Sequence, residues 1–209
     1  MKPLWGSKGA VGKADEDEEE SKGKTPVVGN RILFYQQVDQ SSMLDLILKL
    51  RETEEELLAA AIAYEIEPPP IHLHINSYGG EVFAALGAMD HILACRVPVW
   101  TYVDGGAASA ATMLSVVGHK RFIYPNGYML IHQISSAFWG KHEEWKDEAK
   151  NLDKLMEQMR GLYRKHGRVP ETDLLEILKH DLWLDAEKCL AWGLVDEIKR
   201  PPPKGASIA

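Results

Sequence analysis

The sequence predicts an α/β protein in which strands and helices alternate in a wound, layered architecture. Short apolar runs, typical of buried strands, alternate with longer segments whose apolar residues recur every three or four positions. Glycine-rich junctions follow two of the expected strands, where the chain must turn sharply into a helix. The chain has 209 residues, and 45% of them are apolar, which is enough to bury one sizeable core. We therefore expect one α/β domain.

The first part of the chain predicts one strand and one long helix. Residues 31–35 are expected to form a short apolar strand. A helix is expected over residues 42–65, because a Ser-x-x-Asp pattern made by Ser42 and Asp45 opens a periodic apolar segment. The three prolines at positions 68–70 end this helix, since proline cannot continue one.

Two strand-turn-helix units follow. Residues 71–76 have strand character and turn through a Gly-Gly pair into a helix over residues 82–95. Residues 97–103 form the next strand, residues 104–106 a turn, and residues 107–117 a helix of small side chains. Each unit therefore places a glycine-rich turn between a strand and a helix.

The longest expected helix lies in the second half of the chain. Short strands near residues 121–124 and 128–131 precede it, and it spans about residues 142–166. Charged residues fill one of its faces, so its single apolar stripe needs a partner, either the core of its own chain or another subunit. The stripe consists of Trp145, Ala149, Leu152, Leu155, Met156, Met159, Leu162 and Tyr163.

Both ends of the chain differ in composition from the part between them. Residues 1–24 contain five lysines and six acidic residues and almost no aliphatic residues, which predicts a disordered, charged leader. Residues 200–209 include three consecutive prolines and predict a second tail. The folded domain is therefore expected over residues 25–199.

Composition and charge argue against several classes of protein. Lys and Arg total 24 against 31 Asp and Glu, and the net charge of −7 does not favour binding to nucleic acid or to an anionic membrane. No apolar run is long enough to span a membrane, and the N-terminus lacks the apolar region of a secretory signal. Cys95 and Cys189 are the only cysteines, which rules out a disulfide framework and fits a reducing compartment. A soluble, cytoplasmic protein is expected.

The glycine-rich junctions carry the residues that could take part in a chemical reaction. Asn76 to Gly80 can expose backbone N–H groups to a ligand, because paired glycines let the chain turn sharply. Asp104 to Ala111 places Ser109 at the first turn of a helix, where free N–H groups would stabilise an oxyanion beside its hydroxyl. The alternative is that Ser109 is a packing residue in a helix of small side chains.

His132 supplies a third element of the same chemistry. It follows an apolar strand, and a lone histidine in such a place is more often structural than catalytic. A serine hydroxyl, however, is a poor nucleophile unless a neutral imidazole takes its proton. Together, Ser109, His132 and the Gly-Gly loop provide three of the parts that acyl transfer needs.

These motifs closely resemble those of the proteolytic subunit of the Clp protease. The resemblance covers about residues 30–198, and its motifs occur in the family's order and at its spacing. They are Ile75-Asn76-Ser77-x-Gly79-Gly80, Gly105-x-Ala107-Ala108-Ser109, Met129-x-Ile131-His132-Gln133, Leu162-Tyr163-x-x-His166, Trp183-Leu184-x-Ala186 and Gly193-Leu194-Val195-Asp196.

The resemblance implies a fold, an assembly and a site. Members of the family, which share a crotonase-like architecture, fold as repeated strand-strand-helix units with a protruding handle helix, here residues 142–166, and stack as two heptameric rings around a chamber. Carried over by position, Ser109 is the nucleophile, His132 the general base, and the backbone N–H groups of Gly80 and Ala110 form the oxyanion hole. The implied activity is hydrolysis of peptide bonds in unfolded proteins or peptides, with no cofactor and no metal.

The third member of the catalytic triad is missing from its usual position. The family's aspartate aligns with Ile177, which cannot orient an imidazole. Carboxylates stand nearby at Asp173, Glu176 and Asp181. Asp173 and Asp181 share the face of Ile177 if the helix is continuous, while Asp181 also matches a second family aspartate. We expect one of the three carboxylates to support His132; otherwise a Ser-His dyad remains.

The expected partner surface also departs from the family. His72-Leu73-His74 replaces a Tyr-Leu-Tyr strand that in the family helps to receive loops of an ATP-driven AAA+ unfoldase. The family's N-terminal gating segment is absent before Asn30, where the charged leader stands instead. Docking of a standard unfoldase is therefore in doubt. A metal site at His72 and His74 has little support, since no third ligand is evident.

Three alternatives to a self-compartmentalising protease follow from these departures. A non-catalytic or weakly active ring subunit would explain Ile177. A phage-type prohead maturation protease that works without an unfoldase would explain the altered pocket and gate. A relative that acts on acyl thioesters is the third, but no motif for binding coenzyme A supports it.

Overall fold

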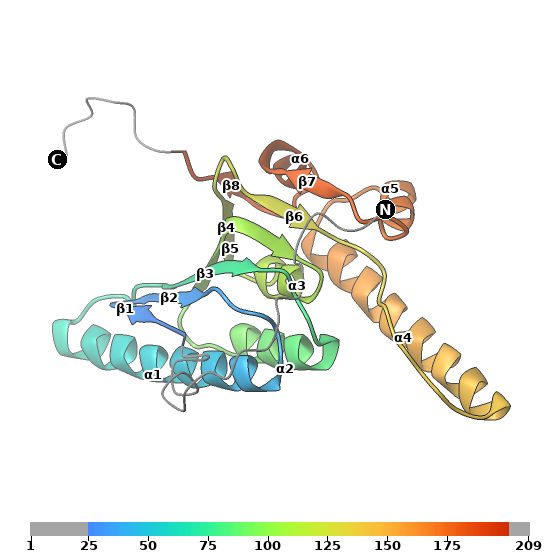
Figure 1. Ribbon diagram of the computed structural model, residues 1–209. Helices are drawn as coiled ribbons and strands as arrows, with labels where there is room; N and C mark the ends of the chain where they lie inside the picture. The colour runs from blue at the N-terminus through green and yellow to red at the C-terminus, as the bar shows by residue number, and fades with distance from the viewer. Residues whose placement is uncertain (1–24, 201–209) are drawn as a thin grey trace, which may run out of the picture.

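The computed structural model describes residues 25–200, so the predicted leader and the tail beyond Arg200 lie outside the described residues. The division of the chain into leader, domain and tail stays a prediction. Within the described part, the strands form one eight-stranded sheet (Figure 1). The strands are β1 (Val27–Val28), β2 (Arg31–Phe34), β3 (Ile71–Ser77), β4 (Val99–Ala108), β5 (Lys120–Ile123), β6 (Tyr128–Leu130), β7 (Trp183–Asp185) and β8 (Glu197–Ile198).

The sheet is mostly parallel, as a wound α/β protein requires. Its main path runs β1-β2-β3-β4-β5-β8, and the pairs from β2 through β8 on this path are parallel. Strand β6 branches from the second half of β4, and β7 adds to β6 in antiparallel orientation. The α/β prediction is therefore confirmed.

The helices connect these strands and cover the sheet. α1 and α2 lie side by side beneath β1 to β3, and α3 contacts α2 and α4 (Figure 1). The helices are α1 (Gln40–Tyr64), α2 (Val82–Leu93), α3 (Ala110–Val116), α4 (His142–His166), α5 (Glu171–Ile177) and α6 (Ala186–Ala191).

The core is built from alternate residues of the central strands. Ile71, Leu73 and Ile75 of β3 have no exposed surface, and they pack in one cluster with Leu46 and Leu50 of α1. Each such side chain contributes about 1.5–3 kcal/mol through burial of its apolar surface. This cluster fixes β3, and with it the glycine loop that follows β3.

The start of α1 differs from the sequence prediction. Asp39 rather than Ser42 is the N-cap, and its carboxylate accepts a hydrogen bond from Ser42 N–H at 2.8 Å, while Ser42 Oγ accepts from Asp39 N–H at 3.0 Å. Asp45 instead accepts a hydrogen bond from the N–H of Thr25. Aspartate is as good a cap as serine, so the local pattern allowed either register.

Strand β4 runs through the segment that was expected to be a turn. Gly105 and Gly106 continue the strand, and the helix after it begins at Ala110 instead of Ala107. The reason is non-local: β6 pairs with residues 106–108, and Ser77 of β3 pairs with Ala107. These partners supply backbone hydrogen bonds that outweigh the low strand propensity of glycine.

Five short elements were not predicted from the sequence: β1, β7, β8, α5 and α6. None has more than seven residues, so none carries enough periods of a helical or strand pattern to be recognised. Three of them, α5, β7 and α6, follow one another and complete the region next to His132.

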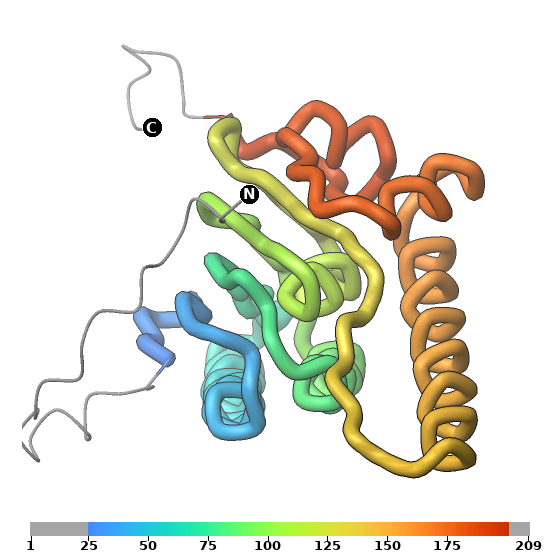
Figure 2. Tube along the Cα trace, turned by 45° about the vertical axis from the view of Figure 1, so that its right-hand side comes forward, coloured from blue at the N-terminus to red at the C-terminus, as the bar shows by residue number. Residues whose placement is uncertain are grey.

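Helix α4 has the predicted bounds and stands away from the sheet (Figure 2). An extended segment leads from β6 to the far tip of α4, and two contacts hold it to the helix: Ile134 N–H with Met156 Sδ at 3.2 Å, and Ser136 with Glu148 at 3.3 Å. Of the residues in its apolar stripe, Met159 and Tyr163 are buried. Within residues 25–200, no helix has both the length and the apolar character needed to cross a membrane.

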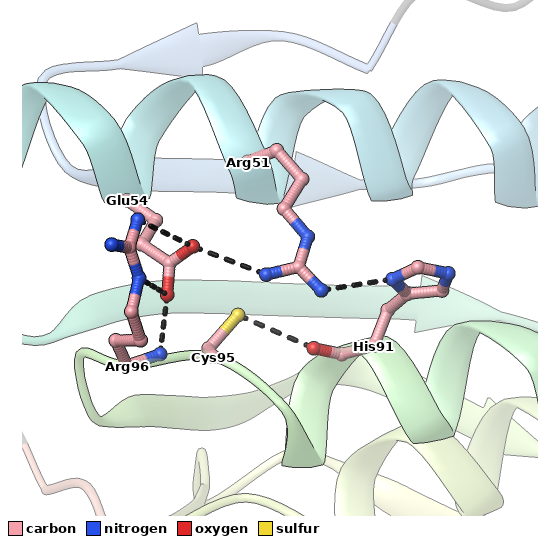
Figure 3. Close-up of polar contacts among 5 residues, drawn as sticks. All are labelled: Arg51, Glu54, His91, Cys95 and Arg96. Carbon is pink, nitrogen blue, oxygen red and sulfur yellow. Dashed lines mark hydrogen bonds and ion pairs between the residues drawn. The ribbon is translucent and has the colours of Figure 1, made fainter.

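A buried carboxylate joins α1 to the chain that leaves α2 (Figure 3). Glu54 is 1% exposed; it accepts hydrogen bonds from the backbone and guanidinium of Arg96 and pairs with Arg51 at 3.1 Å. Arg51 also contacts His91 Nδ1 at 3.1 Å. Burial alone would raise the pKa of Glu54, but the hydrogen bonds from Arg96 and Arg51 hold this pKa below its ordinary value.

Candidate active site

Ser109 lies at the junction of β4 and α3 in a rarely populated backbone conformation. Its φ of 54° and ψ of −127° fall where non-glycine residues are uncommon, at a cost of about 1–3 kcal/mol. The surroundings fix this geometry: Ser109 N–H donates to Leu130 O at 2.8 Å, and Ser109 O accepts from the Thr112 hydroxyl at 2.6 Å. A strained serine at a strand-to-helix turn is the arrangement of a nucleophile elbow.

The Gly-Gly loop after β3 packs directly against this turn. A Cβ atom built on Gly79 would lie 2.8 Å from Ser109 Cβ and 2.9 Å from Ala110 N, so a larger residue at position 79 could not approach as closely. Gly79 has a φ of 87°, and its N–H donates to Ser77 Oγ at 3.1 Å. Only a glycine can therefore bring this loop against the first turn of α3.

The loop is held on its other side by Val38. Val38 N–H donates to Gly79 O at 2.9 Å, and Glu81 N–H donates to Val38 O at 2.8 Å. Among the described residues, the N–H groups of Gly80 and Ala110 donate no hydrogen bond. Free N–H groups on the loop and on the turn that holds a serine are the donors that an oxyanion hole needs.

His132 is paired with Asp181. His132 Nδ1 lies 2.9 Å from Asp181 Oδ1, and the two side chains are 26% and 78% exposed. When the carboxylate accepts from Nδ1–H, the neutral imidazole keeps its lone pair on Nε2 and can accept a proton there. Because Asp181 is largely exposed, solvent weakens this pair relative to a buried one.

The other carboxylates considered from the sequence do not contact His132. Helix α5 ends at Ile177, so the condition of a continuous helix is not met, and Asp173 and Asp181 do not share a helix face. Ile177 is 7% exposed and belongs to the core. Glu176 is held by Lys179 at 2.8 Å and His180 at 3.1 Å, and these contacts lower its pKa.

Two backbone links bring Asp181 to His132. Gln133 N–H donates to Leu178 O at 2.7 Å, and Leu130 pairs with Trp183 in the β6–β7 ladder. Residues 130 and 133 flank His132, while residues 178 and 183 flank Asp181. The pairing thus arises from the turn after α5, and no local sequence signal at position 181 marks it.

The histidines of β3 have other partners. His72 Nδ1 lies 2.8 Å from the Tyr102 hydroxyl, and His74 Nδ1 lies 2.7 Å from Asp104 Oδ2. In the part of the chain that the structure describes, no three His, Cys, Asp or Glu side chains come together as metal ligands would. Both histidines therefore belong to hydrogen-bonded contacts between β3 and β4.

Comparison with known proteins identifies the family. The profile of the Clp protease family matches residues 28–202. The ATP-dependent Clp protease proteolytic subunit of Deinococcus radiodurans is 34% identical over 130 residues, which are 61% of this chain and 64% of that protein. A ClpP1 mutant from Listeria monocytogenes has the same fold, with a TM-score of 0.71 and 24% identity over 83% of this chain and 93% of that one. The resemblance inferred from the motifs is confirmed, and the chain belongs to the Clp protease family.

Proposed function

We propose that the chain is a serine endopeptidase of the Clp type. Ser109 Oγ attacks the carbonyl carbon of a peptide bond while His132 Nε2 takes the hydroxyl proton. The N–H groups of Gly80 and Ala110 stabilise the oxyanion of the tetrahedral intermediate. Asp181 accepts from His132 Nδ1–H, which fixes the tautomer and stabilises the imidazolium.

The second half of the reaction uses the same groups. The His132 imidazolium gives its proton to the leaving amine as the bond between carbonyl carbon and nitrogen breaks. Water then attacks the acyl-serine while His132 takes its proton. As the bond between the acyl carbon and Ser109 Oγ breaks, His132 returns this proton to Oγ, and the acid product leaves. No cofactor or metal is required for either half.

The observation that carries this proposal is the His132–Asp181 contact of 2.9 Å. His132 is two residues after Leu130, whose carbonyl accepts a hydrogen bond from the Ser109 N–H at 2.8 Å. The His132–Asp181 contact supports Asp181 as the carboxylate of the triad, in place of the one that is missing at Ile177. This favours an active enzyme over a Ser-His pair without orientation.

The substrates and the assembly belong to the same proposal. The substrates are unfolded polypeptides or short peptides, and the chain acts as a homo-oligomer of two stacked heptameric rings in the cytoplasm. The name of the Deinococcus relative, an ATP-dependent proteolytic subunit, supports an unfoldase partner. His72 and His74, which occupy the partner surface, argue that any such unfoldase differs from the standard one. Neither nucleic acid nor a membrane is a proposed partner.

Two alternatives have specific support. The exposure of Asp181, 78%, favours a weakly active or non-catalytic ring subunit, because an exposed carboxylate orients histidine less firmly. The altered β3 surface favours a phage-type prohead maturation protease that works without an unfoldase. Activity on peptides separates the first alternative from the proposal, and dependence of protein degradation on an unfoldase separates the second.

Labelling with a fluorophosphonate tests the chemistry. This reagent phosphonylates only an activated serine, so wild type should be labelled at Ser109 and Ser109→Ala should not be labelled. Ser135→Ala is the matched control, since Ser135 is exposed and lies three residues after His132. An unreactive wild type, or equal labelling of Ser109→Ala, would exclude the proposed function.

A further inference from the structure

An aromatic pocket is lined by residues of the same segments that carry the proposed catalytic groups. Its volume is about 480 Å³. It adjoins a second open pocket, of about 600 Å³, that the glycine loop lines; Asn76 and Tyr78 belong to both. The aromatic pocket is lined by Asn76, Tyr78, Gly105, Gly106, Tyr128 and Trp183.

The walls of the aromatic pocket are exposed rings, and its floor is glycine. Tyr78, Tyr128 and Trp183 are 72%, 46% and 43% exposed. The rings of Tyr78 and Trp183 meet edge to face, with centroids 6.3 Å apart. A Cβ atom on Gly106 would lie 3.8 Å from Trp183, so any side chain at that position would fill part of the space. Because no charged residue among positions 25–200 lines the pocket, its chemistry suits a large apolar group.

Each wall is attached to a segment that carries a proposed catalytic group. Tyr78 is two residues before Gly80, and Gly106 is three residues before Ser109. Tyr128 stands four residues before His132, and Trp183 stands two residues after Asp181. A ligand in the pocket would therefore contact all four segments that form the reaction centre.

We infer that the aromatic pocket binds a large apolar side chain of the substrate, on the residue that follows the scissile bond. This inference rests on the proposed peptidase function. The leaving amine must lie next to His132, because His132 gives it a proton. Two of the three aromatic walls, Tyr128 and Trp183, belong to the segments of His132 and Asp181, so the pocket lies on the leaving-group side.

Peptides that vary only at the residue after the scissile bond test this inference with the assembled, full-length chain. Wild type should cleave peptides with Phe or Leu at this position with a kcat/KM about 10-fold or more above the Ala peptide. In Trp183→Ala and in Tyr128→Ala, the ratio of kcat/KM for Phe over Ala should fall at least about threefold. This ratio does not depend on the fraction of active enzyme, so partial misfolding cannot produce the result.

Two control variants should keep the wild-type ratio. Leu182→Ala changes a residue next to Trp183 that is 59% exposed and does not line the aromatic pocket, and Tyr64→Ala removes an exposed tyrosine at the end of α1. The inference is overturned if wild type shows no preference at this position, or shows it only before the scissile bond. It is also overturned if Lys is preferred to Phe, or if Trp183→Ala lowers all rates equally. A wild type that resists fluorophosphonate would instead refute the proposed function itself.

Discussion

Ser109 and Gly79 show how the site depends on single backbone conformations. Ser109 holds a strained φ of 54°, and Gly79, with a φ of 87°, packs within contact distance of it. The glycine loop that carries the Gly80 N–H packs against the turn that carries the Ala110 N–H only because both conformations occur together. Strain at such a site is maintained by the hydrogen bonds to Leu130 and Thr112 that surround it.

Replacing Gly79 with alanine should disable the site more than it destabilises the fold. A Cβ atom there would lie 2.5 Å from Ala108 O and 2.8 Å from Ser109 Cβ, both fixed parts of the elbow. The loop must shift, and the Gly80 N–H moves with it, so the rate constant for fluorophosphonate labelling should fall about 100-fold or more. Gly87→Ala is the control, since Gly87 lies in α2 with nothing within 4 Å; this variant should label normally. Wild-type labelling of Gly79→Ala would exclude the proposed oxyanion hole.

At the scale of elements, the contact of Glu54 with Arg96 and Arg51 joins α1 to the end of α2. Glu54 is 1% exposed, whereas its partners Arg51 and Arg96 are 37% and 64% exposed. Removing the charge of Glu54 leaves a buried polar side chain with weaker partners, while solvent still reaches both guanidinium groups. Arg96 follows the C-terminal end of α2, whereas the glycine loop of the proposed active site precedes its N-terminal end. We therefore assign the contact of Glu54 with Arg96 a purely structural role.

Glu54→Gln should therefore lower the free energy of unfolding by about 1–3 kcal/mol at pH 7. The pKa of Glu54 is lowered in the fold, so this stabilisation is complete above the ordinary pKa of glutamate and is lost as the pH falls through the lowered value. Urea unfolding of wild type and variant should give a difference that is constant near neutral pH and shrinks in acid.

Glu52→Gln is the matched control for this prediction. Glu52 is 61% exposed and pairs with Lys49 on the surface of the same helix, so its loss should change little. Equal effects of the two substitutions, or a difference that grows in acid, would contradict the structural role of Glu54.

At the scale of the whole molecule, α4 is the helix whose apolar side chains a single chain covers only in part. Its apolar stripe runs along most of its length, yet only Met159 and Tyr163 are buried, and Trp145 is 51% exposed. An amphipathic helix of this kind needs a partner for the rest of the stripe. We propose that the two stacked rings meet through this helix, which would supply that partner.

Trp145→Glu should therefore split the assembly. We expect wild type to sediment as a particle of fourteen subunits and the variant as smaller species, because a charge at a buried contact is costly. Asp153→Ala, on the exposed face of the same helix, should sediment like wild type. Analytical ultracentrifugation measures both. A monomeric wild type, or an intact variant particle, would contradict the proposed role of α4.

The sequence predicts long elements well because their patterns are local. The bounds of α4 match the predicted residues 142–166, since the periodic stripe runs through the helix. The extension of β4 through Gly105 could not be predicted, because it depends on pairing with β6 more than 20 residues later. Within the site, the motifs around Ser109 and His132 mark candidates, but the choice of Asp181 depends on where α5 ends.

Peptide turnover by three carboxylate variants tests the central claim, that Asp181 orients His132 for catalysis by Ser109. Asp181→Ala should lower kcat by about 100-fold or more, since the loss of an orienting carboxylate costs up to about 10⁴ in serine proteases. Asp173→Ala and Glu176→Ala should keep the wild-type rate, because neither side chain contacts His132. Wild-type turnover by Asp181→Ala, or a comparable loss in either of the other two variants, would contradict the account.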